Sequence, residues 1–206
     1  VGCVCNNAEI RNETLYGQPT EGALLALAMK MDMHDTRSKY TRTLEIPFSS
    51  DNKWMAVKCQ PLKNNVTQEV YFMKGALERV LNQCKTFNNY GTPATLTVKR
   101  LEMFAEEAKM FGRSGLRVLA MAVGTDMNAL TFVGMVGIID PPRPGVIESI
   151  HTLLGTGVSI KMVTGDAEET AVAIVTVDYL QADPRPICNG RARNRDHMIP
   201  EQGVSP

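Results

Sequence analysis

The sequence lacks the features that would place it in a membrane or on a nucleic acid. A membrane-spanning helix requires about 18 apolar residues in a row, and no apolar run here approaches that length. The first residues do not form a signal peptide. The 22 basic residues balance 22 acidic residues over 206 positions, so no excess of positive charge favours nucleic acid or an acidic lipid surface. We therefore expect a water-exposed globular segment that contacts neither nucleic acid nor membrane directly.

Cysteine and histidine are also sparse, and their spacing does not suggest a metal site. The five cysteines include no C-x-x-C pair, and the three histidines show no ligand spacing. Cys59 falls in a strand-like pattern and Cys84 in a helix-like pattern, where buried free thiols are common. Two N-x-T triplets, at Asn12 and Asn65, are short enough to occur by chance. We expect no protein-built metal site and a reducing compartment.

Two common phosphate-binding loops are absent as well. The sequence contains no G-x-x-x-x-G-K-[ST] motif, and no G-x-G-x-x-G motif opens a helix. Any nucleotide site in this chain is therefore neither a P-loop nor a dinucleotide-binding turn.

The sequence does contain clear hydrophobic periodicity, and the order of helix-like and strand-like patterns changes along the chain. Apolar stripes predict helices that begin after an N-cap at Thr20, over 76–84, and over about 97–111 with an end at Gly112. Apolar runs predict an antiparallel pair of strands at 54–59 and 69–74, and further strands at 116–123 and 131–139. The adjacent prolines 141 and 142 end this sheet.

Beyond those prolines the pattern becomes helix, strand, turn and helix. Pro144 suits the first turn of a helix that closes at Gly155 and Gly157, and a strand follows at 158–163. We predict an α/β protein with three parts. Residues 1–139 form an antiparallel sheet flanked by helices, residues 140–175 form a hinge and part of a second α/β domain, and residues 176–206 form a disordered tail.

Several residues could carry chemistry, although pattern alone leaves each of them open. Lys74 ends an apolar strand beside Gly75, where it either lines a pocket or extends into solvent. Phe48 precedes Lys53 in a turn and is either a core residue or a stacking platform. Arg117 shares a strand face with Leu119.

The loop Thr164-Gly165-Asp166 lies between the predicted strand and a helix. A helix start attracts anions, yet Asp166 is itself an acid.

Taken in order, six motifs resemble the cytosolic part of the P-type cation ATPases. They are GQPTEGAL (17–24), FSSDNK (48–53), FMKGA (72–76), GLRVLAMA (115–122), GIIDPPRPGV (137–146) and MVTGD (162–166). The flanking stretches GCVCNNAEIRN, KWMAVKC and VSIKMVTGD are most similar to the secretory-pathway calcium/manganese pumps. The resemblance extends from residue 1 to about residue 174.

The resemblance implies a fold and a set of roles. The nucleotide-binding domain of that family is an antiparallel sheet flanked by helices, inserted into a haloacid-dehalogenase-like phosphorylation domain. By resemblance, Phe48 stacks on adenine, Glu21 reaches the adenine edge and Lys74 lines the pocket. The further nucleotide contacts that it implies are Lys53, Gly75, Arg117, Leu119, Asp140 and Arg143. Thr164, Gly165 and Asp166 support phosphoryl transfer on the phosphorylation-domain side.

The function implied by the resemblance belongs to a larger protein. The D-K-T-G-T motif with the phosphorylated aspartate and the G-D-G-x-N-D-A segment with the Mg²⁺ ligand are both absent. We expect the ATP-binding cytosolic portion of a calcium (calcium/manganese) pump that uses ATP and Mg²⁺ and is catalytically incompetent alone. Its partners are the pump's phosphorylation, actuator and transmembrane domains, in a Golgi or secretory-pathway membrane. The alternative is a truncated product that acts only as an ATP-binding or interaction module.

Overall fold

The chain consists of two compact units, which are described separately. The computed structural model describes residues 1–33, 36–62, 68–139, 143–164 and 168–174. The first unit covers Val1–Pro141, and the second begins at Pro142. The predicted tail at 176–206 lies outside the described residues, as do Asp140, Gly165 and Asp166.

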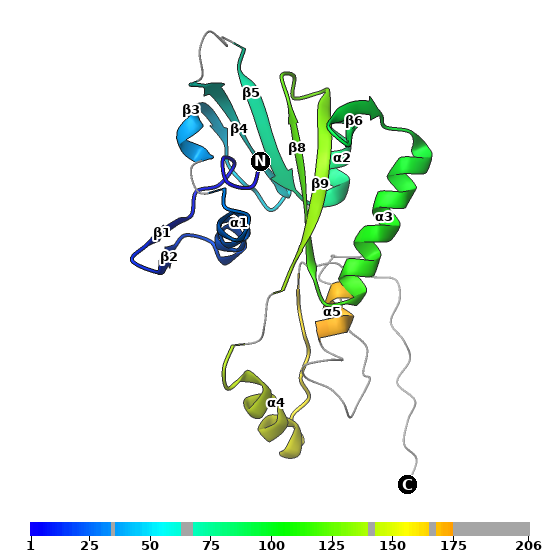
Figure 1. The fold of residues 1–206 in the computed structure, drawn as a ribbon. Helices are drawn as coiled ribbons and strands as arrows, with labels where there is room; N and C mark the ends of the chain where they lie inside the picture. The colour runs from blue at the N-terminus through cyan, green and yellow to red at the C-terminus, as the bar shows by residue number, and fades with distance from the viewer. Residues whose placement is uncertain (34–35, 63–67, 140–142, 165–167, 175–206) are drawn as a thin grey trace. The chain divides into compact units, whose positions relative to one another are not determined.

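A seven-stranded sheet forms the body of the first unit (Figure 1). Its strands lie in the order β3 (Tyr40–Ile46), β4 (Trp54–Pro61), β5 (Val70–Gly75), β8 (Arg117–Gly124), β9 (Leu130–Ile138), β6 (Cys84–Asn89) and β7 (Thr92–Thr95). Neighbouring strands are antiparallel except β6 and β9, which are parallel. The predicted antiparallel pair is confirmed as β4 and β5, and β9 lies inside the sheet.

Helices flank this sheet on both of its faces. Figure 1 shows α2 (Leu77–Leu81) and α3 (Val98–Arg113) on one side, and α1 (Pro19–Lys30) on the other with the hairpin of β1 (Glu9–Arg11) and β2 (Thr14–Tyr16). A single 3₁₀ turn, Arg37–Lys39, leads into β3. The α/β class and the antiparallel sheet flanked by helices are therefore confirmed.

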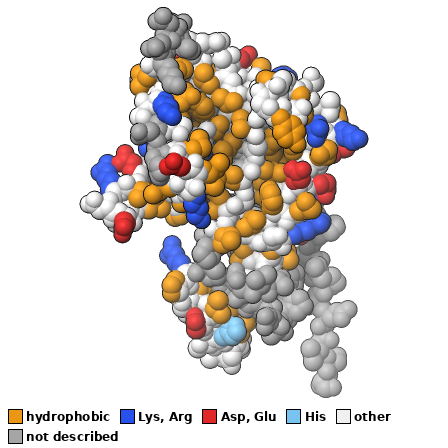
Figure 2. All heavy atoms as spheres, in the orientation of Figure 1, with side chains coloured by type: hydrophobic (Ala, Val, Ile, Leu, Met, Phe, Trp, Pro, Cys, Tyr) orange, Lys and Arg blue, Asp and Glu red, His pale blue; other side chains and the backbone are white. Residues whose placement is uncertain are grey.

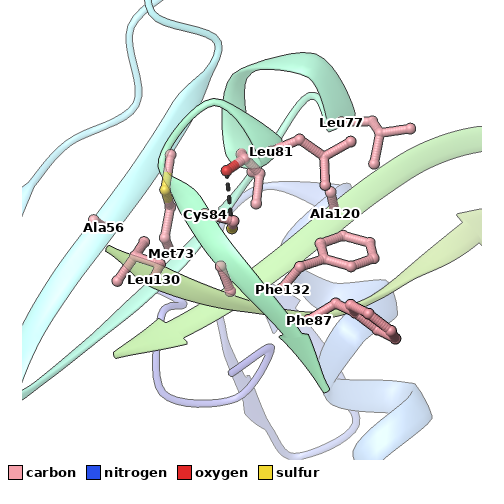
Figure 3. Close-up of a cluster of buried hydrophobic side chains, with 11 residues drawn as sticks. Ala56, Met73, Leu77, Leu81, Cys84, Phe87, Ala120, Leu130 and Phe132 are labelled. Atoms are coloured by element: carbon pink, nitrogen blue, oxygen red, sulfur yellow. Dashed lines mark hydrogen bonds between the residues drawn. The ribbon is translucent and has the colours of Figure 1, made fainter. Parts of the chain in front are cut away.

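The face under α2 and α3 is closed by a large apolar cluster (Figure 3). Side chains alternate between the two faces along a strand, and the side chains of β4, β5, β8 and β9 on this face contribute to the cluster. Its buried members are Ala56, Met73, Leu77, Val80, Leu81, Cys84, Phe87, Ala120, Ala122, Leu130 and Phe132. Phe104 of α3 packs against Phe87 and Phe132, with ring centroids 5.9 and 4.7 Å away. We call these residues the closed-face cluster.

The opposite face holds a smaller apolar cluster near the chain start. Met55, Val57 and Cys59 of β4 and Phe72 of β5 pack with Val4 and Cys5 of the first segment. The edge of the Tyr40 ring meets Phe72 at a centroid distance of 5.1 Å. This cluster covers only part of its face, because it draws on β4 and β5 and reaches no further than Val123 of β8.

Helix ends differ from the sequence prediction at two points. Helix α1 begins at Pro19 with Gln18 as the extended N-cap, so Thr20 is not the cap. Proline suits the first helical position, where a missing N–H costs nothing, and it moves the start back by two residues. Helix α3 has Thr97 as its N-cap, but it continues through the predicted end at Gly112, and Gly115 adopts a positive φ of 72° beyond its end.

The helix predicted over 76–84 is wrong in its second half. Helix α2 ends at Leu81, and Cys84 is the first residue of β6. An apolar residue three positions after Leu81 fits a helical stripe and a buried strand equally well, so periodicity did not separate them. The Cys84 Sγ still donates back to the carbonyl of Val80, at 3.1 Å, as the dashed line in Figure 3 shows.

In the second unit, the described residues contain α4 (Val146–Gly155) and the short α5 (Glu168–Ile174). Gly145 is the N-cap of α4, with φ 84°, so Pro144 precedes the helix. The strand predicted at 158–163 is wrong, because these residues have no regular secondary structure. A lone extended segment needs a paired neighbour to satisfy its backbone groups, and no described segment pairs with it. No described helix is long and apolar enough to cross a membrane.

Candidate functional site

The site begins with a lysine inside an apolar strand. Lys74 lies opposite Met55 in β4 and Met121 in β8, and the alternation of β5 places it on the same face as Phe72. Only 8% of its side chain is exposed. Its Nζ donates to Oε1 of Glu21 at 2.6 Å, so the buried ammonium is paired rather than extended into solvent.

Glu21 comes from the first turn of α1, and its side chain is 12% exposed. A helix start stabilises a carboxylate, because unpaired N–H groups give it partial positive charge. Burying a charge is costly without a partner, and Lys74 is that partner. The two residues are 53 positions apart, so the pair fastens α1 to the centre of the sheet.

Asn6 fixes the helix turn that carries Glu21, and sequence reasoning missed it. Its side chain is buried, with 1% of the residue exposed. The Nδ2 group donates to the carbonyls of Gly2 and Glu21 at 2.8 and 2.9 Å, and Oδ1 accepts from the backbone N–H of Ala8 at 2.9 Å. One asparagine in a short polar stretch gives no periodic signal by which sequence analysis could have found it.

The surroundings of Lys74 include a buried thiol. Burial raises the pKa of Cys5 to about 11, while the nearby charges of Lys74 and Arg42 act to lower it. The Cys5 Sγ donates to the carbonyl of Met55 at 3.5 Å. Among the described cysteines all are free thiols, so the prediction of buried unpaired thiols at Cys59 and Cys84 is confirmed.

Strand β8 adds an arginine to the same face. Arg117, Leu119 and Met121 alternate along β8, and Met121 is the neighbour of Lys74. The Nη1 of Arg117 donates to Oγ1 of Thr20 at 3.4 Å. The first turn of α1 therefore meets Lys74 through Glu21 and Arg117 through Thr20. Leu119 is half-buried and lies between Arg117 and Met121 on this face of β8, opposite Val136 of β9.

The loop between β3 and β4 presents an aromatic ring to solvent. Phe48 is 62% exposed, so it is not the core residue that pattern analysis left open. The loop after it closes on itself, because the N–H of Lys53 donates to the carbonyl of Ser49 at 2.8 Å and the N–H of Asn52 to its Oγ at 3.2 Å. Lys53 has a positive φ of 58°, which is uncommon for a residue with a side chain.

This loop meets the end of β5 directly after Lys74. Trp54 pairs with Gly75, and the N–H of Ala76 donates to the carbonyl of Lys53 at 2.9 Å. The loop that carries Phe48 is thus attached to the strand that carries Lys74.

The structure brings some of the predicted site residues together in the first unit, while others belong to the second unit. Glu21, Lys74, Arg117 and Leu119 lie at the sheet face that carries Phe72, which we call the open face. Phe48 and Lys53 lie in the adjoining loop, and this loop contacts the backbone of β5 at Gly75. Arg143 and Thr164 belong to the second unit, where Arg143 is exposed and Thr164 half-buried. The described residues contain no group of three or more side chains suited to holding a metal ion.

Chemically, this face and the adjoining loop offer cations, apolar side chains, one carboxylate and an exposed aromatic ring. Cations attract phosphates, a carboxylate accepts N–H groups, and an aromatic face stacks on a base. The largely antiparallel sheet flanked by helices fits an α/β nucleotide-binding domain.

Comparison with known families gives the class more exactly. The sequence profile described as "P-type ATPase, cytoplasmic domain N" matches residues 1–145. The chain belongs to the P-type ATPase family, and the family predicted from the six ordered motifs is confirmed.

Individual relatives agree with this assignment. The chain is 57% identical over 173 residues to the calcium-transporting ATPase type 2C member 2 of Homo sapiens, covering 84% of this chain and 18% of that protein. It is 54% identical over 175 residues to type 2C member 1 of Bos taurus, covering 85% and 18%. A more distant relative, calcium-transporting ATPase 1 of Schizosaccharomyces pombe, is 36% identical over 181 residues, covering 83% and 20%. The chain spans about a fifth of the length of these relatives.

Proposed function

We propose that this chain is the ATP-binding cytosolic portion of a P-type calcium (calcium/manganese) transporting ATPase. It presents ATP for phosphorylation of an aspartate that is not among its own residues. Family membership and relatives that are named as calcium-transporting ATPases support the proposal. The parent protein couples ATP hydrolysis to ion transport in a Golgi or secretory-pathway membrane, with this segment on the cytosolic side.

The observation that carries the proposal is the buried pair of Glu21 and Lys74, next to a loop with an exposed Phe48. Phe48 stacks on adenine, and Glu21 accepts from the base edge while Lys74 holds its carboxylate in place. Lys53 and Arg117 attract the phosphates, because opposite charge and hydrogen bonding act together there. Leu119 and Gly75 complete the pocket without adding charge.

Residues from Asp140 onward supply the phosphoryl-transfer side of the proposal. Asp140 and Arg143 contact the nucleotide, and Thr164, Gly165 and Asp166 support phosphoryl transfer. Bound Mg²⁺ would neutralise charge on the phosphates, and its protein ligands are largely outside this chain. Alone, the chain binds ATP but is catalytically incompetent.

Titration of the chain with ATP tests the proposal. We expect weak binding, in the high-micromolar to millimolar range or roughly −4 to −6 kcal/mol, because a stacking platform and cations act without a complete metal site. In an NMR titration the amides near Phe48 and Lys74 should shift. Lys74→Ala should weaken binding, and full affinity in both Lys74→Ala and Phe48→Ala would refute the site.

The phosphoryl-transfer role needs a separate comparison. Asp166→Asn should leave ATP binding by this chain nearly unchanged, yet strongly impair phosphoenzyme formation by the full-length pump, because transfer depends on positioning and electrostatics at the reacting phosphate. Normal phosphorylation of the full-length variant would show that the Thr164-Gly165-Asp166 loop has no such role.

A further inference from the structure

The junction between the Phe48 loop and β5 contains a close approach of two backbones. Trp54 and Gly75 lie opposite each other at the ends of β4 and β5. One residue beyond, the N–H of Ala76 donates to the carbonyl of Lys53 at 2.9 Å. The last residue of the loop is therefore hydrogen-bonded to the residue that follows Lys74 and Gly75.

Only glycine fits at position 75 in this arrangement. A Cβ built there would lie 2.5 Å from the carbonyl oxygen of Lys53 and 2.5 Å from the Cβ of Trp54. Both neighbours belong to backbone or to the stem of a side chain, so neither can rotate away. Glycine is required here by the lack of room for a side chain and not by backbone conformation, since Gly75 has no positive φ.

The loop would transmit a displacement at Lys53 rather than absorb it. Hydrogen bonds from Lys53 and Asn52 to Ser49 close the segment into a tight turn. Lys53 holds a positive φ of 58° within it, and such strained residues persist only where their surroundings fix them. Phe48 immediately precedes Ser49, so a shift of the Lys53 carbonyl moves the base of the aromatic ring.

We propose that Gly75 is a positioning residue that sets the Phe48 ring at its working distance from Lys74. This inference rests on the proposed ATP site and names a residue through which that site is assembled. Gly75 does its work by lacking a side chain. A methyl group there separates β5 from the loop and leaves Phe48 and Lys74 individually intact but wrongly spaced.

The test is an NMR titration of the 206-residue chain with ATP, comparing four forms with wild type. They are Gly75→Ala, Phe48→Ala, the double variant, and the control Gly155→Ala, whose added Cβ meets nothing within 4 Å. Gly75→Ala should bind ATP about tenfold more weakly, because a misplaced ring loses its stacking energy. Gly155→Ala should bind like wild type.

The double variant separates positioning from a general loss of structure. If Gly75 acts through the ring, adding Gly75→Ala to Phe48→Ala should cost no further affinity, since the ring is already gone. Equal losses in both backgrounds would overturn the inference, as would wild-type affinity in Gly75→Ala. A wild-type chain that binds no ATP would instead overturn the proposed function, and this inference with it.

Amide exchange of the wild-type chain decides the matter even if Gly75→Ala does not fold. With ATP at ten times its Kd, exchange at the Ala76 N–H should slow about tenfold, because opening the junction would dismantle the site. The N–H of Leu96, which follows β7 and donates to the carbonyl of Lys85 in β6 at 3.0 Å, should be unaffected. Unchanged exchange at Ala76 under saturating ATP would overturn the inference.

Discussion

The two faces of the central sheet are built from the same strands but differ in kind. Met73 and Lys74 are adjacent in β5, yet Met73 is fully buried in the closed-face cluster and Lys74 pairs with Glu21 on the other side. The closed face has helices α2 and α3 over it, while the open face carries its apolar cluster only near β4 and β5. The closed face therefore contains most of the apolar core, and the open face carries the charged residues of the candidate site.

On the face of the first unit visible in Figure 2, apolar and charged side chains gather in different places. Figure 2 shows hydrophobic side chains gathered across the middle of the first unit and charged side chains around its margin. Phe48, at 62% exposure, is among the large apolar side chains left open to solvent. This exposure excludes a core role for Phe48 and leaves its ring accessible to a ligand.

Breaking the buried pair should produce the largest effect and should affect both stability and binding. Lys74→Met leaves the Glu21 carboxylate buried without its donor, so the free energy of unfolding should fall by about 3–5 kcal/mol. Chemical denaturation measures this loss. The double variant Lys74→Met with Glu21→Gln should recover most of the stability but not the ATP affinity. Recovery of both would mean that the pair is structural only.

A cavity on the closed face should affect stability alone. Leu130 is fully buried, so Leu130→Ala should lower the free energy of unfolding by about 2–5 kcal/mol. ATP affinity, measured well below the unfolding midpoint, should remain that of wild type. A parallel loss of affinity would contradict the separation of the two faces.

The buried thiols sharpen the comparison with a smaller effect. Burial raises the pKa of Cys84 to about 12 on the closed face and that of Cys5 to about 11 on the open face, from an ordinary value of 9.0. Above pH 9 the unfolded thiols lose their protons and the folded ones keep them, so stability falls as pH rises.

Each thiol should therefore remove about 1 kcal/mol of stability between pH 9 and pH 10. Denaturation curves at both pH values check this against Cys84→Ala and Cys5→Ala. In each variant the loss of stability between pH 9 and pH 10 should be smaller than in wild type by the contribution of the missing thiol. The contribution of Cys84 should continue to grow to a higher pH than that of Cys5, because the folded pKa of Cys84 is higher. An unaltered decline in both variants would show that other groups cause it.

Sequence reasoning found the centre of the sheet and missed its edges. Strands β4, β5, β8 and β9 carry long apolar runs because both of their faces are at least partly covered. Strand β7 has four residues, includes Pro93 and is largely exposed, and proline is tolerated there because β7 is an edge strand. Strand β3, at the other edge, is likewise mostly exposed. Such strands have little apolar signal to detect.

The site was predictable in its members but not in its connections. Lys74 and Phe48 stood out because each is an unusual residue in its local pattern, and the ordered motifs identified the family. The pairing of Lys74 with Glu21 and the support from Asn6 depend on contacts between segments that are distant in sequence. Local periodicity carries no information on such contacts, so only the folded chain reveals them.

The proposed function requires that the open face binds ATP and that the exposed Phe48 ring stacks on the base. The most direct test measures two quantities on Phe48→Ala, the ATP affinity by NMR titration and the free energy of unfolding by urea denaturation. We predict an affinity loss of about tenfold, since stacking on a base is worth about 1–3 kcal/mol. The free energy of unfolding should change by no more than about 0.5 kcal/mol, because the ring is exposed. Unchanged affinity, or a large loss of stability with no separate loss of binding, would contradict the account.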